Sequence, residues 1–327
     1  MSRKRQHGMT LIELMVAMLI GTILIGGAIT VFVQSRASYR TADSLARLQE
    51  NARFALDTLA PDIRLARFWG LNNQPELINI PPGVTASCAG TDTATATAWT
   101  LNLNEPIAAV DDLYNLACAA TDARNDTDVL IVRHASAREN VPAKGAGQIQ
   151  IRSDVSSGLL FDDGIEPAGF GPEAKTHDVI VNAYYVSNRS TLDDDLPALR
   201  RLSLTDNGAT ATMQDQEIMP GVENMQVQFG VDTDDDGQVD RYVDSDHAVL
   251  TPGAAGFVPG ARIVAVRLWL LLRSETSEAG LGFIDTGNYT PPDANLAPIS
   301  PTADPLYPAE FRRLSISKTV VLRNVQS

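Results

Sequence analysis

The sequence is poor in the residues that nucleic-acid surfaces and transition-metal centres require. The 327-residue chain has two cysteines and four histidines. Lysine and arginine number 26 against 40 aspartates and glutamates, which gives a formal net charge of −14 at pH 7. Because phosphate neutralisation needs clustered lysine and arginine, we expect no nucleic-acid partner. Any ion that the chain binds is expected to be a cation.

The chain also lacks the motifs of the common enzyme classes. The histidines are scattered without metal-ligand spacing, at His7, His134, His177 and His247. No Gly-x-Ser-x-Gly nucleophile elbow, phosphate-binding loop or reactive-cysteine context occurs. A membrane-tethered periplasmic hydrolase would instead need a convergent pocket with perturbed titratable groups. The sequence predicts that the protein is not an enzyme.

The two cysteines, Cys88 and Cys118, do not have the spacing of a zinc or redox motif. If the domain that carries them is exported, one disulfide between them is the favoured interpretation. Closing this loop would stabilise the fold by roughly 3–4 kcal/mol in the chain-entropy account. The alternative is a pair of buried free thiols.

The N-terminus has a basic segment followed by a long apolar run. Arg3, Lys4 and Arg5 stand in the basic segment, and the apolar run covers residues 9–33 with Glu13 as its one charge. At about 1.5 Å of rise per residue, a helix of this length crosses a bilayer. The basic segment is expected to hold the N-terminus in the cytoplasm. The remainder of the chain should then lie outside the inner membrane.

The helical pattern continues beyond the apolar run, where apolar residues recur at the three- and four-residue steps of one buried face: Leu45, Leu48, Ala52, Leu56 and Leu59. We therefore expect one long helix, membrane-spanning over residues 9–33 and amphipathic over residues 34–68, that Pro61 does not end sharply. Residues 69–327 would form the exported β-rich globular domain.

Glu13 is the anomaly of the apolar run. A charged group at the centre of a membrane helix costs roughly 2.5–3.5 kcal/mol to insert, which favours a functional interpretation. If the chain is cut after Gly8, Glu13 would lie near the positive end of the helix dipole, and the freed α-amino group of a neighbouring chain could pair with it. Such a pair would set the register between subunits. The alternative is a carboxyl that stays protonated or reaches the membrane interface.

Beyond Trp69 the helical period stops and short segments rich in valine, isoleucine and tyrosine begin, separated by turn-forming residues. The clearest expected strands are residues 128–134, 179–186, 199–204, 225–231, 262–273 and 314–322. Alternation over 262–273 predicts a sheet with one buried face. We expect an α+β fold in which the amphipathic half of the helix covers an antiparallel sheet. Residues 72–98 and 281–308 are expected to be surface insertions.

Residues 8–17, with the sequence GMTLIELMVA, closely resemble the class III signal of type IV pilins and pseudopilins. The resemblance implies a pilin-like fold and cleavage after Gly8 by a prepilin peptidase. It also implies that Met9 is the processed, methylated N-terminus and that Glu13 is the glutamate of the assembly contact. The family most often has phenylalanine where this chain has Met9.

Further stretches narrow the resemblance. Residues 50–56 (ENARFAL) with 62–64 (DIR) resemble the helix of PilW-type minor pilins, which are related to the J-type minor pseudopilins of type II secretion. Residues 220–232 and 322–324 resemble a central segment and the C-terminal strand of the same group.

The resemblance implies a minor pilin that starts in the inner membrane and ends in a type IV pilus at the cell surface, serving adhesion and twitching motility. Its implied partners are prepilin peptidase, other minor pilins, the major pilin, membrane lipid and a PilY1-like tip adhesin. The alternative is a J-type pseudopilin of a type II secretion system.

The sharpest motif of the exported part is an acidic loop, DTDDDGQVD, over residues 232–240. Carboxylates at alternate positions before a glycine supply the oxygen ligands that Ca²⁺ prefers. The EF-hand pattern would need glutamate where Val243 stands, so the alternative is a solvated acidic hairpin without metal. No other cofactor is expected. The candidate calcium ligands are Asp232, Asp234, Asp236, Gln238, Asp240 and, from a loop one residue longer, Asp244.

Overall fold

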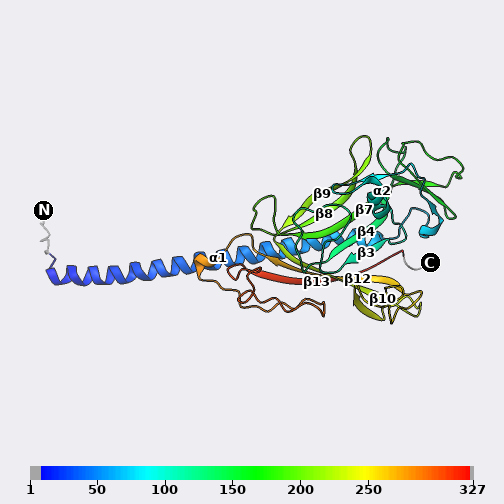
Figure 1. The fold of residues 1–327 in the computed structure, drawn as a ribbon. Helices are drawn as coiled ribbons and strands as arrows, with labels where there is room; N and C mark the ends of the chain where they lie inside the picture. The colour runs from blue at the N-terminus through cyan, green and yellow to red at the C-terminus, as the bar shows by residue number, and fades with distance from the viewer. Residues whose placement is uncertain (1–8, 325–327) are drawn as a thin grey trace, which may run out of the picture. The chain divides into compact units, whose positions relative to one another are not determined.

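A computed structural model describes residues 9–324 of the chain. The chain divides into two compact units, Met1–Arg47 and Leu48–Ser327. Helix α1, Leu11–Leu65, begins in the first unit and ends in the second (Figure 1). It is the long helix that the sequence predicts, and it continues past Pro61 as expected.

In the first unit, α1 carries a continuous exposed apolar surface. Leu11, Ile12 and Leu24 are each at least two-thirds exposed, and a window of 18 residues is long and apolar enough to cross a membrane. Such a surface is unfavourable in water and matches the hydrocarbon of a bilayer. Arg36 and Arg40 are exposed, as the amphipathic pattern predicts.

The second unit contains two sheets, whereas the sequence led us to expect one. The larger has nine strands, in the order β1-β6-β5-β7-β8-β9-β2, with β4 paired to β7 and β3 to β4. Its pairs are antiparallel except β1 with β6 and β2 with β9. Its strands are β1 (Ile78–Asn79), β2 (Ala86–Ser87), β3 (Ile107–Val110), β4 (Val129–Glu139), β5 (Gln150–Ser153), β6 (Gly158–Phe161), β7 (Lys175–Ser187), β8 (Ala198–Asp206) and β9 (Ala211–Pro220).

The smaller sheet is antiparallel, in the order β11-β10-β12-β13. The six strands expected from the sequence are confirmed as β4, β7, β8, β10, β12 and β13. The remaining elements are the helix α2 (Thr93–Thr100) and two 3₁₀ turns, η1 (Pro75–Leu77) and η2 (Ala279–Leu281). The strands of the smaller sheet are β10 (Val222–Asp232), β11 (Arg241–Asp244), β12 (Arg262–Arg273) and β13 (Arg313–Val321).

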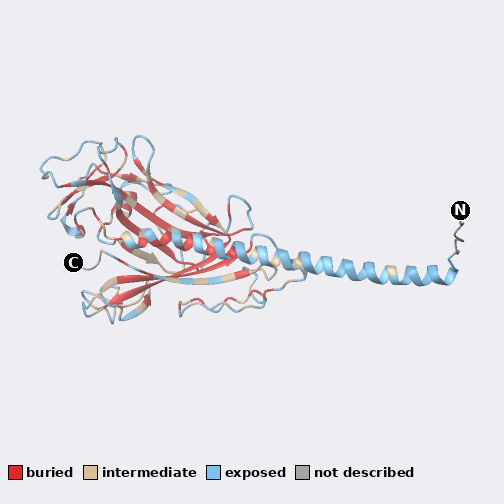
Figure 2. Ribbon diagram, turned by 180° about the vertical axis from the view of Figure 1, so that it is seen from behind, coloured by how far each residue is buried: buried red, intermediate tan, exposed pale blue. Residues whose placement is uncertain are grey.

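The C-terminal part of α1 lies between the two sheets. One core cluster joins this helix to the inner faces of both sheets, and Figure 2 shows the buried residues that run along it. The helix follows the predicted spacing, because four residues of its series are almost fully buried: Leu48, Ala52, Leu56 and Leu59. The helix is thus the middle layer of a three-layer unit, where we had expected a cover on one sheet.

The outer face of the smaller sheet is also covered. Trp269 and Leu271 of β12 are buried against Ile299 and Tyr307, which lie in the long segment between η2 and β13. The segment expected to be a surface insertion therefore packs part of its length on the sheet. Sequence alternation alone missed this cover, because the covering residues are isolated within a loop rich in proline and glycine.

A buried ion network fixes this loop to the smaller sheet. The Arg313 guanidinium donates to Glu223 Oε2 at 2.6 Å and to Asp285 Oδ2 at 3.1 Å. All three residues are buried. Because each charge has a hydrogen-bonded partner of opposite sign, the burial of this network is tolerated.

A polar cluster ties α1 to the larger sheet. The Asp62 carboxylate accepts hydrogen bonds from Tyr184 Oη at 2.6 Å and from the Asn182 amide, and its other oxygen lies 3.5 Å from His134 Nε2. Burial acts to raise the pKa of Asp62, but the hydrogen bonds and the charge of His134 outweigh it and leave this pKa below its usual value.

We predict that Asp62→Asn makes the fold less sensitive to acid. Because the folded-state pKa of Asp62 is lowered, its ionised form stabilises the fold above the unfolded-state pKa of about 4, and this contribution is lost as pH falls through the lower folded-state value. In urea unfolding of the full chain in detergent, wild type should have a higher free energy of unfolding than Asp62→Asn above about pH 5. This difference should shrink below about pH 4.

The matched control is Asp57→Asn on the same helix. Asp57 is exposed and pairs with Lys318 at 3.1 Å, and exposed pairs of this kind contribute about 0–1 kcal/mol. If the difference in free energy of unfolding between wild type and Asp62→Asn stays constant down to about pH 2, the role assigned to Asp62 is wrong.

Candidate functional site

The carboxylate of Glu13 lies at the start of α1, where the sequence predicts an assembly contact. Glu13 Oε2 accepts hydrogen bonds from the Thr10 backbone N–H at 2.9 Å and from Thr10 Oγ1 at 3.0 Å. In return, the Glu13 backbone N–H donates to Thr10 Oγ1 at 3.4 Å. This reciprocal arrangement is a capping box, which satisfies backbone donors at a helix N-terminus.

The capping box gives Glu13 a local structural role that we did not anticipate. The signal was present in the sequence, since Thr10 and Glu13 have the Thr-x-x-Glu spacing of this motif. Both hydrogen bonds go to Oε2, and Glu13 is exposed. Oε1 is therefore able to accept a hydrogen bond from a donor on another molecule.

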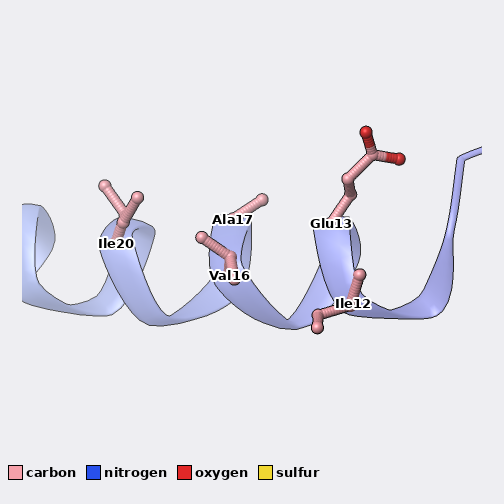
Figure 3. Close-up of a pocket in the computed structure, with 5 residues that line it drawn as sticks. All are labelled: Ile12, Glu13, Val16, Ala17 and Ile20. Atoms are coloured by element: carbon pink, nitrogen blue, oxygen red, sulfur yellow. The ribbon is translucent and has the colours of Figure 1, made fainter.

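The surroundings of Glu13 are apolar. Ile12, Val16, Ala17 and Ile20 line a shallow groove beside it, and in Figure 3 the Glu13 side chain extends away from the helix. Ile12, Val16 and Ile20 are each at least half exposed. A single carboxylate on an apolar helix face is suited to a contact inside lipid, where an opposite charge would find it with little competition from water.

The residues of the expected processing site lie at the edge of the described chain. Gly8, the expected cleavage residue, falls outside the described residues. Met9 is 69% exposed and precedes α1.

The two cysteines form the disulfide that the sequence favoured. Cys88 and Cys118 are bonded, with their Cα atoms 5.4 Å apart, so the alternative of two free thiols is wrong. Cys88 directly follows β2, and Cys118 lies between β3 and β4. Beside the bond, the Ala119 N–H donates to the Ala89 carbonyl at 2.8 Å. The disulfide thus packs into a second core cluster, which lies on the larger sheet next to α2.

The acidic motif forms the turn of the β10–β11 hairpin. Asp232 ends β10 and is 2% exposed, and its carboxylate accepts hydrogen bonds from the backbone N–H groups of Asp234, Asp235 and Gly237. Burial acts to raise the pKa of Asp232, but these backbone donors outweigh it and leave the pKa lowered. The loop is therefore well ordered by its own hydrogen bonds.

Only part of the expected calcium ligand set comes together. Asp232, Asp234 and Asp240 place one oxygen each within 4.8 Å of one another. Asp236 instead accepts a hydrogen bond from the Gln238 backbone N–H at 2.7 Å. The gathered set is thus three carboxylates, fewer than the six ligands expected from the sequence, which were five aspartates and Gln238.

Asp244 does not join the acidic hairpin loop. It lies at the far end of β11, opposite Gln228 of β10, and accepts a hydrogen bond from the Gln228 amide at 3.0 Å. Each residue of β11 moves the chain about 3.4 Å from the loop, so the short strand carries Asp244 out of reach.

A second acidic cluster, which we did not predict, lies near enough to Asp244 for its charge to act on Asp111. Asp111, Asp112 and Asp293 place one oxygen each within 4.8 Å of one another. Burial, followed by the negative charge of neighbouring aspartates, raises the pKa of Asp111 to about 7 and that of Asp112 to about 6. Nothing in the local sequence pattern predicts this cluster, because Asp293 is far from the other two along the chain and stands in a loop.

Comparisons with known proteins identify two regions of the chain. Residues 3–29 match the prokaryotic N-terminal methylation motif, and residues 183–324, from β7 to the end of the described chain, match the family described as type IV pilus-assembly protein W. Among solved structures, the chain is similar to a type IV-like pilin from Thermus thermophilus, with 13% identity and a TM-score of 0.31, over 88% of this chain and 100% of that one. No curated protein matches the chain.

We predict that removing the disulfide weakens the second unit. The double variant Cys88→Ser/Cys118→Ser should lower the free energy of unfolding by roughly 3 kcal/mol, because the unfolded chain regains the freedom of the open loop. Urea unfolding of the full chain in detergent measures the effect, and wild type unfolded in a thiol reductant should match the variant. A loss smaller than about 0.5 kcal/mol would show that the bond is dispensable.

Proposed function

We propose that this chain, which matches the type IV pilus-assembly protein W family over residues 183–324 and the N-terminal methylation motif over residues 3–29, acts as a minor pilin. In this proposal, prepilin peptidase removes residues 1–8 after Gly8 and methylates the new N-terminus at Met9. The mature chain then joins other minor pilins to start a type IV pilus, to which the major pilin is added, and remains in the complex at the pilus tip. A PilY1-like adhesin at that tip would connect it to adhesion and twitching motility.

One observation carries the proposal. The first unit presents an apolar helix face that is exposed along its length and carries Glu13 near its N-terminal end. A soluble protein gains nothing from such a surface, whereas a subunit that leaves the bilayer for a filament can bury it against the same surface of its neighbours.

Glu13 supplies the specific element of this packing. Apolar helices can shift along one another at little cost in free energy, so contact area alone does not fix their relative position along the filament axis. A carboxylate that pairs with the positive N-terminus of the adjacent subunit defines one height, because a displaced subunit would leave both charges unpaired in an apolar surrounding. The free Oε1 of Glu13 is suited to this bond while Oε2 keeps its contacts with Thr10.

The second unit fits a location outside the cytoplasm. Its disulfide is of the kind that forms in oxidising compartments such as the periplasm. In the proposed topology the N-terminus faces the cytoplasm, residues 9–33 span the inner membrane, and the domain that follows lies in the periplasm before the chain enters the pilus. The proposed work is structural, without a catalytic step.

The acidic hairpin loop gives this function a calcium candidate. Three carboxylates, from Asp232, Asp234 and Asp240, are close enough to share a Ca²⁺ ion. Their hydrogen bonds with the backbone also make a stable loop without an ion. In the proposal, Ca²⁺ binding at this loop is an addition to the pilin role, which stands without it.

The experiment replaces Glu13 in a way that separates its two roles. Glu13→Gln removes the charge but keeps a capping-box acceptor, whereas Glu13→Ala removes both. If the charge sets the subunit register, both variants should lose surface pili at matched protein levels, with cleavage after Gly8 unaffected. The readouts are the mass of the membrane-extracted chain and the amount of pili sheared from cells.

The control is Glu50→Gln, an exposed glutamate further along the same helix, which should assemble like wild type. Normal piliation of Glu13→Gln with loss in Glu13→Ala would show that Glu13 acts only as a helix cap. Normal piliation in both, with failed secretion of exoproteins, would instead identify a subunit of a type II secretion system.

A further inference from the structure

The aspartates of the second acidic cluster come from segments that are far apart in sequence. Asp111 and Asp112 directly follow β3 of the larger sheet, and Asp293 lies in the long segment between η2 and β13 that covers the smaller sheet. The fold nevertheless places one carboxylate oxygen of each within 4.8 Å of the others. Three like charges at this distance repel one another strongly when they are partly withdrawn from water.

A second observation is that Asp293 has a buried carboxylate oxygen that is not paired within the described part of the chain. The residue is 5% exposed, and its Oδ1 accepts a hydrogen bond from the Asn295 backbone N–H at 2.7 Å. Its Oδ2 is buried and has no hydrogen-bond partner among residues 9–324, and the same is true of Asp112 Oδ1. Buried carboxylate oxygens are normally paired, because each one left unpaired loses its hydration without compensation.

Protein cations do not neutralise this cluster. Among the ion pairs formed by residues 9–324, none includes Asp111, Asp112 or Asp293. Asp244 and Asp246 lie near enough to add to the negative potential at Asp111. The balance of charge at this place is therefore strongly negative.

We propose that Asp111, Asp112 and Asp293 form a binding site for a hard divalent cation of the Ca²⁺ type. Three carboxylates supply up to six oxygen ligands, and water molecules on the exposed side complete a coordination shell of six to eight. The ligand set contains oxygen alone, which favours Ca²⁺ over zinc or copper. The site is separate from the acidic hairpin loop.

The position of the site gives the cation a structural role. Asp128 is buried beside it and connects the two sheets: Asp128 Oδ1 accepts from the Asp112 backbone N–H at 3.1 Å and Oδ2 from the Val227 N–H of β10 at 2.6 Å. A cation held by Asp112 and Asp293 would join this connection to the loop that covers the smaller sheet. Calcium is therefore expected to stabilise the second unit as a whole.

The test is calcium binding to the full-length chain, purified in detergent and stripped with EDTA. Equilibrium dialysis against radioactive Ca²⁺ counts the bound ions, and thermal unfolding with and without CaCl₂ reports their effect on stability. Wild type should bind calcium at this site and unfold at a higher temperature when calcium is present.

Asp293→Asn is the first variant, because asparagine keeps an oxygen for the Asn295 N–H and removes the charge. It should bind one calcium fewer than wild type and lose the calcium-dependent rise in unfolding temperature. Without calcium it should unfold at or above the wild-type temperature, since one repelling charge is gone. Asp112→Asn, the second variant, should behave in the same way.

Two matched controls separate this site from other carboxylates. Asp234→Asn alters only the acidic hairpin loop and should keep both the calcium of this site and its stabilising effect. Asp194→Asn, on an exposed turn, should match wild type. A wild type that binds no calcium, or Asp293→Asn and Asp112→Asn chains that bind as many ions as wild type, would overturn the proposal.

Discussion

The burial of one helix face between two sheets is the constraint on which the second unit depends. Leu48, Leu59 and Ile63 are in contact with a core that includes inner residues of both sheets, so neither sheet has a complete core without the helix. The apolar surface buried here supplies the main driving force for folding. Asp62 fixes the position of the helix along the larger sheet, because its carboxylate accepts hydrogen bonds from Tyr184 and Asn182.

The same helix has opposite solvent preferences in its two parts. From Leu48 onward one face of the helix is buried in the core of the second unit, whereas Leu11, Ile12 and Leu24 of the first unit are exposed. An exposed apolar surface of this kind favours lipid or other subunits. The proposed filament subunit would need both conditions: a domain with its own core and a helix that stays available for the filament. In the proposed filament, Glu13 would distinguish one packing position from the many that an apolar helix would allow.

Sequence reasoning succeeded where a short-range pattern carries the structure. The period of Leu48, Ala52, Leu56 and Leu59 predicted the helix, short segments rich in valine, isoleucine and tyrosine predicted six strands, and the two cysteines predicted their bond. It failed where contacts join distant segments. Isolated residues such as Ile299 and Asp293 have no periodic neighbours to mark them, so the cover of the smaller sheet and the second acidic cluster became visible only in the fold. The sequence predicted six calcium ligands, because spacing along the chain does not reveal that β11 places Asp244 away from the acidic hairpin loop.

Mass spectrometry of pili sheared from cells and purified tests whether this chain becomes a processed subunit of a pilus. The purified fibres should contain this chain beginning at Met9, with an N-terminal methyl group and the intact Cys88–Cys118 disulfide. A chain found only in the inner membrane, with residues 1–8 still attached, would contradict the account. It would mean that the apolar helix serves as an anchor and that the function resides in the domain beyond it.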